Sequence, residues 1–334
     1  MTNNFPLFRL PYVALREVFS HVGAEVILPL SLCSKRSKHL VKHCQGPRKD
    51  IRIVLNASKK CLEVNNNSFV SVAAKSIFPM NLETVNIGSY VVPVKMERNI
   101  LKTYWTDKKE GLKEVIKHTS DVFSRDLYSI ETWGAVSSAH VRDWLEWIKT
   151  RQTKLRELYL CNEVDDDLLM YILGSDIVTG DLVLYSQCSP GFRGPSPRPY
   201  SIDHLYLNSS SWVTLDHFLA MDIKQIFLRD SHLTSQDVNI FLKKWIKGEC
   251  SKRIKEVCLG ISGRTEFDAL FNDIGVTRRE PNSIRSYVGY KGSEQIVGGF
   301  DVRRKGDGTM ATIMAEHGAL KIMFWPDNKG NPYH

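Results

Sequence analysis

The sequence predicts a small helical segment, then an irregular α/β solenoid with a parallel sheet, then an antiparallel β meander. Three observations support this fold class. Apolar residues recur at helical spacing near the N-terminus, one apolar frame recurs along the middle of the chain, and short alternating runs separated by glycine turns follow it. The chain has 334 residues, of which 43% are hydrophobic, so it can bury a large core, and its length suggests roughly two domains.

The helical segment is predicted to span residues 1–46. One helical face is marked by apolar residues three and four positions apart: Leu15, Val18, Phe19 and Val22. A second apolar stretch follows at 27–33 and ends in a basic tail at 35–38. A segment this short makes a poor core by itself, so we expect it to lend apolar surface to a partner or to the next domain.

A second domain is predicted over residues 47–334. Gly46 and Pro47 interrupt the helical pattern, and alternating runs at 51–55 and 61–64 then predict strands joined by a turn.

From about residue 80 to residue 262 the chain repeats one frame, apolar-x-x-apolar-x-apolar. The copies begin at Leu155, Ile202, Ile223 and Ile254, with a half copy at 182–184, an early copy at 82–87 and a weak one at 128–130. Between 155 and 254 the intervals are 24, 23, 21 and 31 residues, close to the spacing of leucine-rich repeats. Helices are predicted between the strands, including one over 238–246 that begins at a capping box at Thr234 and ends at Gly248. The predicted architecture is therefore an irregular, leucine-rich-repeat-like solenoid.

The end of the chain, about 280–326, predicts an antiparallel meander. Its predicted strands lie at 284–290, 299–304, 310–315 and 320–325. We expect these strands to cover the open edge of the solenoid, since an exposed strand edge invites aggregation.

Several classes of function are disfavoured. Nucleotide-binding, metalloprotease, hydrolase and kinase motifs are absent, so we expect no enzyme and no cofactor. Seven scattered cysteines lack a CxxC pair, which argues against a zinc ribbon and a disulfide framework, and we expect no metal. No export signal or membrane-length apolar run occurs, so we expect no membrane contact and a cytoplasmic or nuclear location.

The net charge of +8 is concentrated in residues 1–60, because the rest of the chain is balanced. A basic face there would attract an acidic partner, whereas the simpler interpretation is a set of solvated lysines. A nucleic-acid partner is disfavoured because the basic residues lack interleaved aromatic residues.

The repeat predicts where a partner would bind. The residue between the last two apolar positions of each strand should face away from the core, and these residues are Tyr159, Val183, Tyr206, Phe227 and Cys258. The aromatic members Tyr159, Tyr206 and Phe227 are the candidate target-binding residues, because aromatic residues concentrate at binding hot spots. The alternative is that the meander or a loop packs over them. The proline-rich segment 186–201 is a second candidate, either for binding or as a mobile insertion.

Two sets of motifs resemble a known combination of domains. Leu7-Phe8-Arg9-Leu10-Pro11 with Ser31-Leu32-Cys33-Ser34-Lys35-Arg36 closely resembles an F-box. The remainder is similar to the type 2 F-box-associated domain in Asp126–Ile130, Trp245–Gly248, Gly299–Arg304 and Asp307–Ile313. The resemblance implies a three-helix F-box followed by an F-box-associated domain.

The resemblance also implies a function: the substrate-recognition subunit of a Skp–cullin–F-box ubiquitin ligase. In that role the F-box would bind the Skp-family adaptor, and through it cullin, while the C-terminal domain would bind an unidentified target protein. Carried over by position, the adaptor-binding residues would be Leu10, Pro11, Leu15, Val18, Leu28, Leu32, Cys33 and Lys35. For each apolar member the alternative is packing inside the domain. The alternative function is a repeat-protein scaffold unconnected to a ubiquitin ligase.

Overall fold

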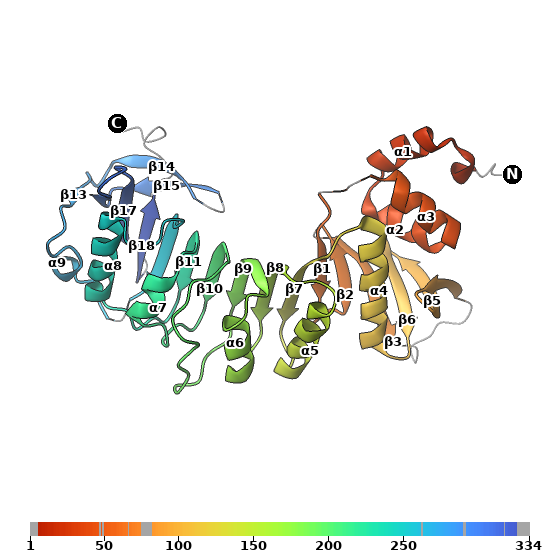
Figure 1. The fold of residues 1–334 in the computed structure, drawn as a ribbon, viewed down its shortest axis with the longest axis horizontal. Coiled ribbons are helices and arrows are strands. Elements are labelled where there is room, and N and C mark those ends of the chain that lie inside the picture. The colour runs from red at the N-terminus through yellow and green to blue at the C-terminus, as the bar shows by residue number, and fades with distance from the viewer. Residues whose placement is uncertain are drawn as a thin grey trace. The chain divides into compact units, whose positions relative to one another are not determined.

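The computed structural model describes residues 6–46, 48, 50–65, 67–74, 82–261, 263–289, 292–316 and 318–325. The predicted segments also contain positions outside these ranges: 1–5 in the helical segment, and 47, 49, 66, 75–81, 262, 290, 291, 317 and 326–334 in the second domain. The chain divides into two compact units, Met1–Gly134 and Ala135–His334, here called unit 1 and unit 2 (Figure 1).

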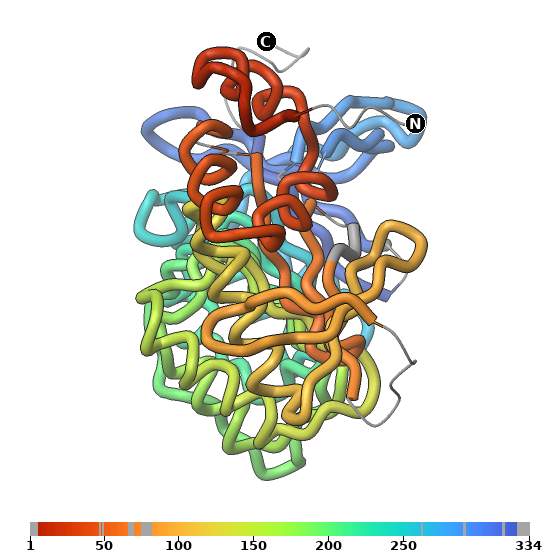
Figure 2. The backbone as a smooth tube through the Cα atoms, turned by 90° about the vertical axis from the view of Figure 1, so that its right-hand side faces the viewer, coloured from red at the N-terminus to blue at the C-terminus, as the bar shows by residue number. Residues whose placement is uncertain are grey.

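Unit 1 begins with the helices that the sequence predicts. A 3₁₀ turn η1 precedes three α-helices: η1 Leu7–Arg9, α1 Tyr12–His21, α2 Ala24–Leu32 and α3 Lys35–Cys44. Helix α1 begins after Pro11, which suits a helix start because its missing N–H is not needed there. Helix α3 begins at a capping box in which the side chains of Ser34 and Ser37 bond to each other's backbone N–H. In Figure 2 these red helices lie at the top of unit 1, above its orange strands.

The rest of unit 1 is a mixed sheet packed against one long helix. In spatial order its strands are β7 Leu127–Trp133, β1 Ile53–Asn56, β2 Cys61–Val64, β3 Asn67–Ala74, β6 Ile100–Trp105, β5 Tyr90–Glu97 and β4 Glu83–Ile87. The β1–β7 and β3–β6 pairs are parallel and the other pairs are antiparallel. Helix α4, Lys108–Phe123, packs on β2, β3 and β6.

The predicted early repeat at 82–87 is wrong in one respect. Its strand β4 exists, but it pairs antiparallel with β5 in a hairpin and does not join a succession of parallel strands. The reason is local: Gly88 adopts φ of +61°, which glycine reaches without strain and which allows the chain to reverse at once.

The helices α1–α3 belong to the same compact unit as the sheet that follows them. Ser31 Oγ lies 2.8 Å from His118 Nε2 of α4, and the amide of Gln45 donates to the Val122 carbonyl. The predicted domain boundary after residue 46 therefore lies inside a continuous packed core, and the division at 46 stays a prediction.

Unit 2 contains five consecutive parallel strands with helices on one face (Figure 1). The elements, in chain order, are α5 Ser138–Lys149, β8 Leu155–Cys161, α6 Asp166–Leu173, β9 Val178–Leu184, β10 His204–Leu207, α7 Leu215–Ala220, β11 Gln225–Leu228, α8 Ser235–Lys247 and β12 Glu256–Gly260. The strands follow one another in space as they do in the chain. The leucine-rich-repeat-like description of this region stays a prediction.

The predicted start and end of α8 are confirmed, and α6 has a cap of its own. Thr234 and Asp237 form a capping box at the start of α8, and Gly248 ends that helix with φ of +77°. Asp165 caps α6, because its side chain accepts a hydrogen bond from the Leu168 N–H at 2.8 Å.

The C-terminal strands are antiparallel, but they form two sheets. Strand β18, Ala319–Phe324, pairs with β12 and so covers the edge of the parallel strands, and β17 Met310–Glu316, β16 Phe300–Arg303 and β13 Thr277–Arg278 follow outward. A short helix α9, Phe267–Leu270, precedes them. Strand β14, Ile284–Val288, lies instead in a separate hairpin with β15, Ser293–Val297, which the predicted meander did not include.

Candidate protein-interaction surfaces

An exposed apolar surface lies on the N-terminal helices. Tyr12, Val13 and Val26 expose 55%, 78% and 44% of their surface, and Pro11 beside them is also exposed. Tyr12 is held in place by its hydroxyl, which donates to the His43 carbonyl of α3 at 3.2 Å. We call Pro11, Tyr12, Val13 and Val26 the helix surface. Large exposed apolar side chains favour a protein partner.

The predicted adaptor-binding residues separate into three groups. Leu15, Leu28 and Leu32 are buried, Leu10 and Val18 are half-buried, and Pro11, Cys33 and Lys35 are exposed. Leu28 and Leu32 face the interior of unit 1, around a small cavity that Val115 of α4 also lines. For the three buried leucines the structure thus shows packing inside the unit, and the adaptor-binding role of the predicted set stays a prediction.

Sequence reasoning missed Tyr12, Val13 and Val26. The helical stripe identified the buried face of α1 correctly, since Leu15 and Phe19 are buried. Val13 lies off that stripe, on the side of the helix that carries Arg16 and Glu17, and this departure was the signal that could have found it.

The positive charge of the first residues is partly neutralised within unit 1. Lys38 and Lys42 of α3 both bind the Asp121 carboxylate, at 2.7 and 2.5 Å, and these two bonds help lower its pKa although burial opposes them. Arg9, Arg16, Lys35 and Arg36 are exposed. An acidic partner would therefore meet the exposed basic residues of η1, α1 and the start of α3.

A second surface lies on the helix-free face of the sheet in unit 2. The strand register places the predicted residues in one unbroken row across β8 to β12: Tyr159, Val183, Tyr206, Phe227 and Cys258. Tyr159, Tyr206 and Phe227 are half-buried, whereas Val183 is buried. The Tyr206 and Phe227 rings lie 6.3 Å apart, so the row is an aromatic surface. Their role in target binding stays a prediction.

Two neighbours extend this row and were not predicted. Tyr185, 44% exposed, packs on Tyr206 with ring centroids 4.7 Å apart. A hydrogen bond with Tyr206 raises the pKa of Arg229, which is exposed beside it. Tyr185 follows Val183 by two positions, and Arg229 follows Phe227 by two positions. Alternate residues of an extended chain face the same side, so this spacing could have identified both residues. We call Tyr159, Tyr185, Tyr206, Phe227 and Arg229 the sheet surface.

The C-terminal hairpin covers one end of the row. Lys321 of β18, next to Cys258, approaches Glu256 at 3.5 Å and Glu294 of β15 at 2.5 Å. Tyr287 of β14 donates its hydroxyl proton to the Lys255 carbonyl at 2.5 Å. The β14–β15 hairpin therefore packs over the β12 end of the sheet.

The proline-rich segment is packed against unit 2. The Phe192 ring meets the Trp212 ring edge-on at 5.8 Å, and the Pro195 carbonyl lies 2.8 Å from His217 Nε2. Arg198 donates to the Gly174 carbonyl at 2.6 Å, and Tyr200 is buried. This segment fills the connection between β9 and β10, where the other connections contain helices.

The described part of the chain contains no group of three or more His, Cys, Asp or Glu side chains placed to hold a metal ion. Within the same ranges no helix is long and apolar enough to cross a membrane.

Comparison with known protein families gives two matches. The F-box domain model matches residues 7–49, and the F-box associated model, type 2, matches residues 199–259. The first match contains the helix surface, and the second contains Tyr206, Phe227 and Arg229 of the sheet surface.

Distant similarity extends to proteins of Caenorhabditis elegans. The E3 ubiquitin-protein ligase hecw-1 is 22% identical over 286 residues, which are 75% of this chain and 22% of hecw-1. The uncharacterized protein F59B2.8 is 21% identical over 75% of this chain and 60% of its own length. The Skn-1 dependent zygotic transcript 15 protein is 22% identical over 73% of this chain and 76% of its own length. The chain thus spans less than two thirds of the first two relatives. No solved structure matches the chain significantly.

Proposed function

We propose that this chain, which carries an F-box domain followed by an F-box-associated segment, is the substrate-recognition subunit of a Skp–cullin–F-box ubiquitin ligase. In this proposal the helix surface binds the Skp-family adaptor, which connects the chain to cullin. The sheet surface binds the target protein. The chain performs no catalysis itself and needs no cofactor.

The observation that carries the proposal is the division of apolar residues within the F-box. Leu28 and Leu32 are buried toward α4, while Pro11, Tyr12, Val13 and Val26 expose apolar surface to solvent. Exposing Val13 to water has a cost that a partner would remove by covering it. The exposed basic residues of η1, α1 and the start of α3 suit an acidic adaptor. The distant relative hecw-1 is an E3 ubiquitin-protein ligase, which agrees with a role in the same pathway.

The test is a pull-down of the purified full chain with a purified Skp-family adaptor. We expect the wild type to bind and Val13→Asp to lose at least about tenfold in affinity, because a charge would be buried in the interface. Val288→Asp is the matched control, since Val288 is a valine of similar exposure, 63%, on β14 of unit 2. Both substitutions replace exposed side chains, so both variants should fold.

Two results would contradict the proposal. Absence of binding by the wild type would favour the alternative of a scaffold unconnected to a ubiquitin ligase. Equal binding by wild type and Val13→Asp would show that the adaptor contacts another surface.

A further inference from the structure

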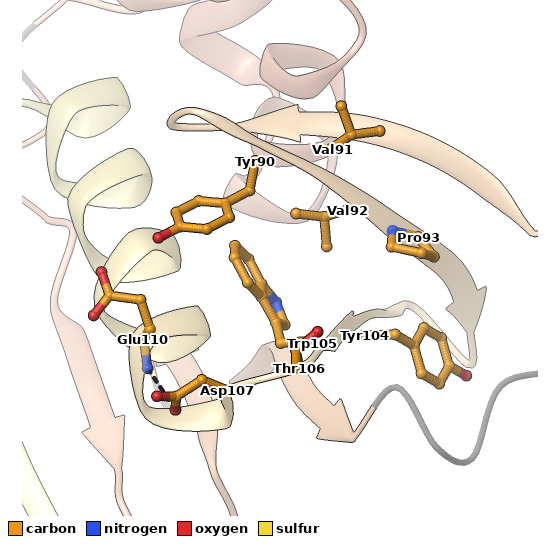
Figure 3. A pocket seen from close by; sticks show the side chains of 9 residues that line it. All are labelled: Tyr90, Val91, Val92, Pro93, Tyr104, Trp105, Thr106, Asp107 and Glu110. Atoms are coloured by element: carbon orange, nitrogen blue, oxygen red, sulfur yellow. Dashed lines mark hydrogen bonds between the residues drawn. The ribbon is translucent and has the colours of Figure 1, made fainter.

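A pocket of about 330 Å³ opens in unit 1, and its lining shares no residue with either surface described above (Figure 3). The pairing of β5 with β6 ends at Val94 opposite Thr103, and the pocket lies beyond that end. The last residue before the pairing is Pro93, whose nitrogen cannot donate to a strand ladder. The pocket is lined by Tyr90, Val91, Val92, Pro93, Tyr104, Trp105, Thr106, Asp107 and Glu110.

Three aromatic residues line the pocket, of which Tyr104 and Trp105 are 6% and 5% exposed. Trp105 is held rigidly, because its indole N–H donates to Thr103 Oγ1 at 2.9 Å and its ring lies against Gly111 of α4. A Cβ at position 111 would come within 2.4 Å of that ring, so glycine is required for this approach. Tyr90, 43% exposed, meets Trp105 edge-on with centroids 5.4 Å apart. Tyr104 stands at the opposite end of the pocket (Figure 3).

Two carboxylates stand at the end where α4 begins. Asp107 caps the helix and accepts hydrogen bonds from the N–H groups of Lys109 and Glu110, at 2.8 and 3.2 Å. These bonds compensate the positive end of the helix dipole. Glu110 has a partly exposed side chain, and Lys113 Nζ lies 3.9 Å from its Oε2. That distance is close to the upper limit for an ion pair, so the contact is loose and a ligand cation can compete with it.

We propose that this pocket binds a methylated ammonium group. The faces of tyrosine and tryptophan rings carry negative potential, which attracts a cation whose methyl groups also make apolar contact. Asp107 and Glu110 add full negative charge at one end and disfavour anionic ligands. Lys108 and Lys109 precede Glu110 in the same helical turn, and their positive charges offset those of the carboxylates. Selectivity for a methylated ammonium group therefore depends more on the aromatic rings than on the net charge. The volume exceeds that of one such group and leaves room for the chain that carries it.

The proposal is tested by titrating the full chain with choline and with its neutral isostere 3,3-dimethyl-1-butanol, using isothermal calorimetry. The two molecules have the same shape and differ in charge. We expect choline to bind roughly threefold to thirtyfold more tightly, the range that cation–π contact supplies. Equal binding of both would show a merely apolar pocket, and no binding of choline would overturn the proposal.

Single substitutions measure the contributions of the aromatic rings and of the carboxylates to choline binding separately. Tyr90→Leu should weaken choline binding at least about threefold, and Glu110→Gln should weaken it by a smaller factor. Glu83→Gln is the matched control, because Glu83 is an exposed acid of β4 that does not line the pocket. Unchanged choline affinity in Tyr90→Leu, with an unchanged melting temperature, would overturn the proposal.

A second titration distinguishes the source of the group. A short peptide with one trimethyllysine is compared with free choline and with the same peptide carrying unmodified lysine. Tighter binding of the trimethylated peptide than of choline identifies a modified protein side chain as the ligand, and equal binding identifies a free ammonium compound. Tighter binding of the unmodified peptide would contradict the assignment to a methylated group.

Discussion

Arg285 and Asp301 form a buried ion pair in the C-terminal part of unit 2. Arg285 Nη1 lies 3.1 and 2.9 Å from the two carboxylate oxygens of Asp301, and these residues are only 1% and 4% exposed. Asp301 also accepts hydrogen bonds from Thr312 Oγ1 at 2.6 Å and from Arg279 Nε at 2.5 Å. The pair therefore connects the β14–β15 hairpin to the larger sheet through β16 and β17.

Removing one partner of this pair should destabilise unit 2. We expect Asp301→Ala to lower the free energy of unfolding by about 3–5 kcal/mol, because Arg285 would remain charged and buried. Arg285→Met should cost less, since Asp301 would keep Arg279 and Thr312. Urea denaturation measures both. As a control, Asp273→Asn breaks an exposed pair with Lys243 and should cost under about 1 kcal/mol; a similar loss in all three variants would contradict this prediction.

The stability of unit 1 should depend on pH through His118. Burial lowers the pKa of His118 to about 4, with Lys38 contributing a smaller effect. Between pH 6.5 and pH 4 the unfolded chain then binds a proton that the folded chain does not, so stability should fall as pH decreases through this range, by up to about 3 kcal/mol. Denaturation of wild type and His118→Gln at several pH values tests this. The variant should lose part of the slope, and identical slopes would disprove the assignment.

The sheet surface should contact the target directly. A photo-crosslinking amino acid at position 185 should capture a protein that the same group at position 170 does not. Met170 is the matched control, because it is 42% exposed but lies on α6, on the helical side of the sheet. Tyr206→Ala should then weaken the captured complex. It should lower the free energy of unfolding by less than truncation of a fully buried aromatic residue would. Equal crosslinking at 185 and 170 would argue against the sheet surface.

The proline-rich segment should respond to substitution as a packed element. Gly194 has φ of +67°, and a Cβ there would come within 2.1 Å of the Trp212 ring. We expect Gly194→Ala to destabilise unit 2 by about 1–3 kcal/mol, through backbone strain and overpacking. Gly191→Ala meets no atom within 4 Å and should be nearly neutral in a thermal melt. Equal effects at the two positions would indicate that the segment is not packed as described.

Much of the fold could be predicted from local patterns. The stripe in α1, the capping box of α8 and the repeated frame of the strands each depend on neighbours in the chain, and each is present. Which strands pair with one another could not be predicted in the same way. Strand β4 pairs with β5 through a turn at Gly88, and the β14–β15 hairpin includes Gly292, which also has a positive φ. The repeated pattern of apolar residues gives no information about these glycine conformations.

The sequence by itself determined which residues are apolar, where α8 is capped and ends, and that a row of aromatic residues shares one face of a sheet. It also carried the motifs of the two matched domains. Only the tertiary structure decided which apolar residues remain at the surface. Leu28 and Val26 are neighbours in one helix, yet Leu28 is 3% exposed and Val26 is 44% exposed. The difference arises because α4, more than eighty residues later, covers one side of α2 and leaves the other open.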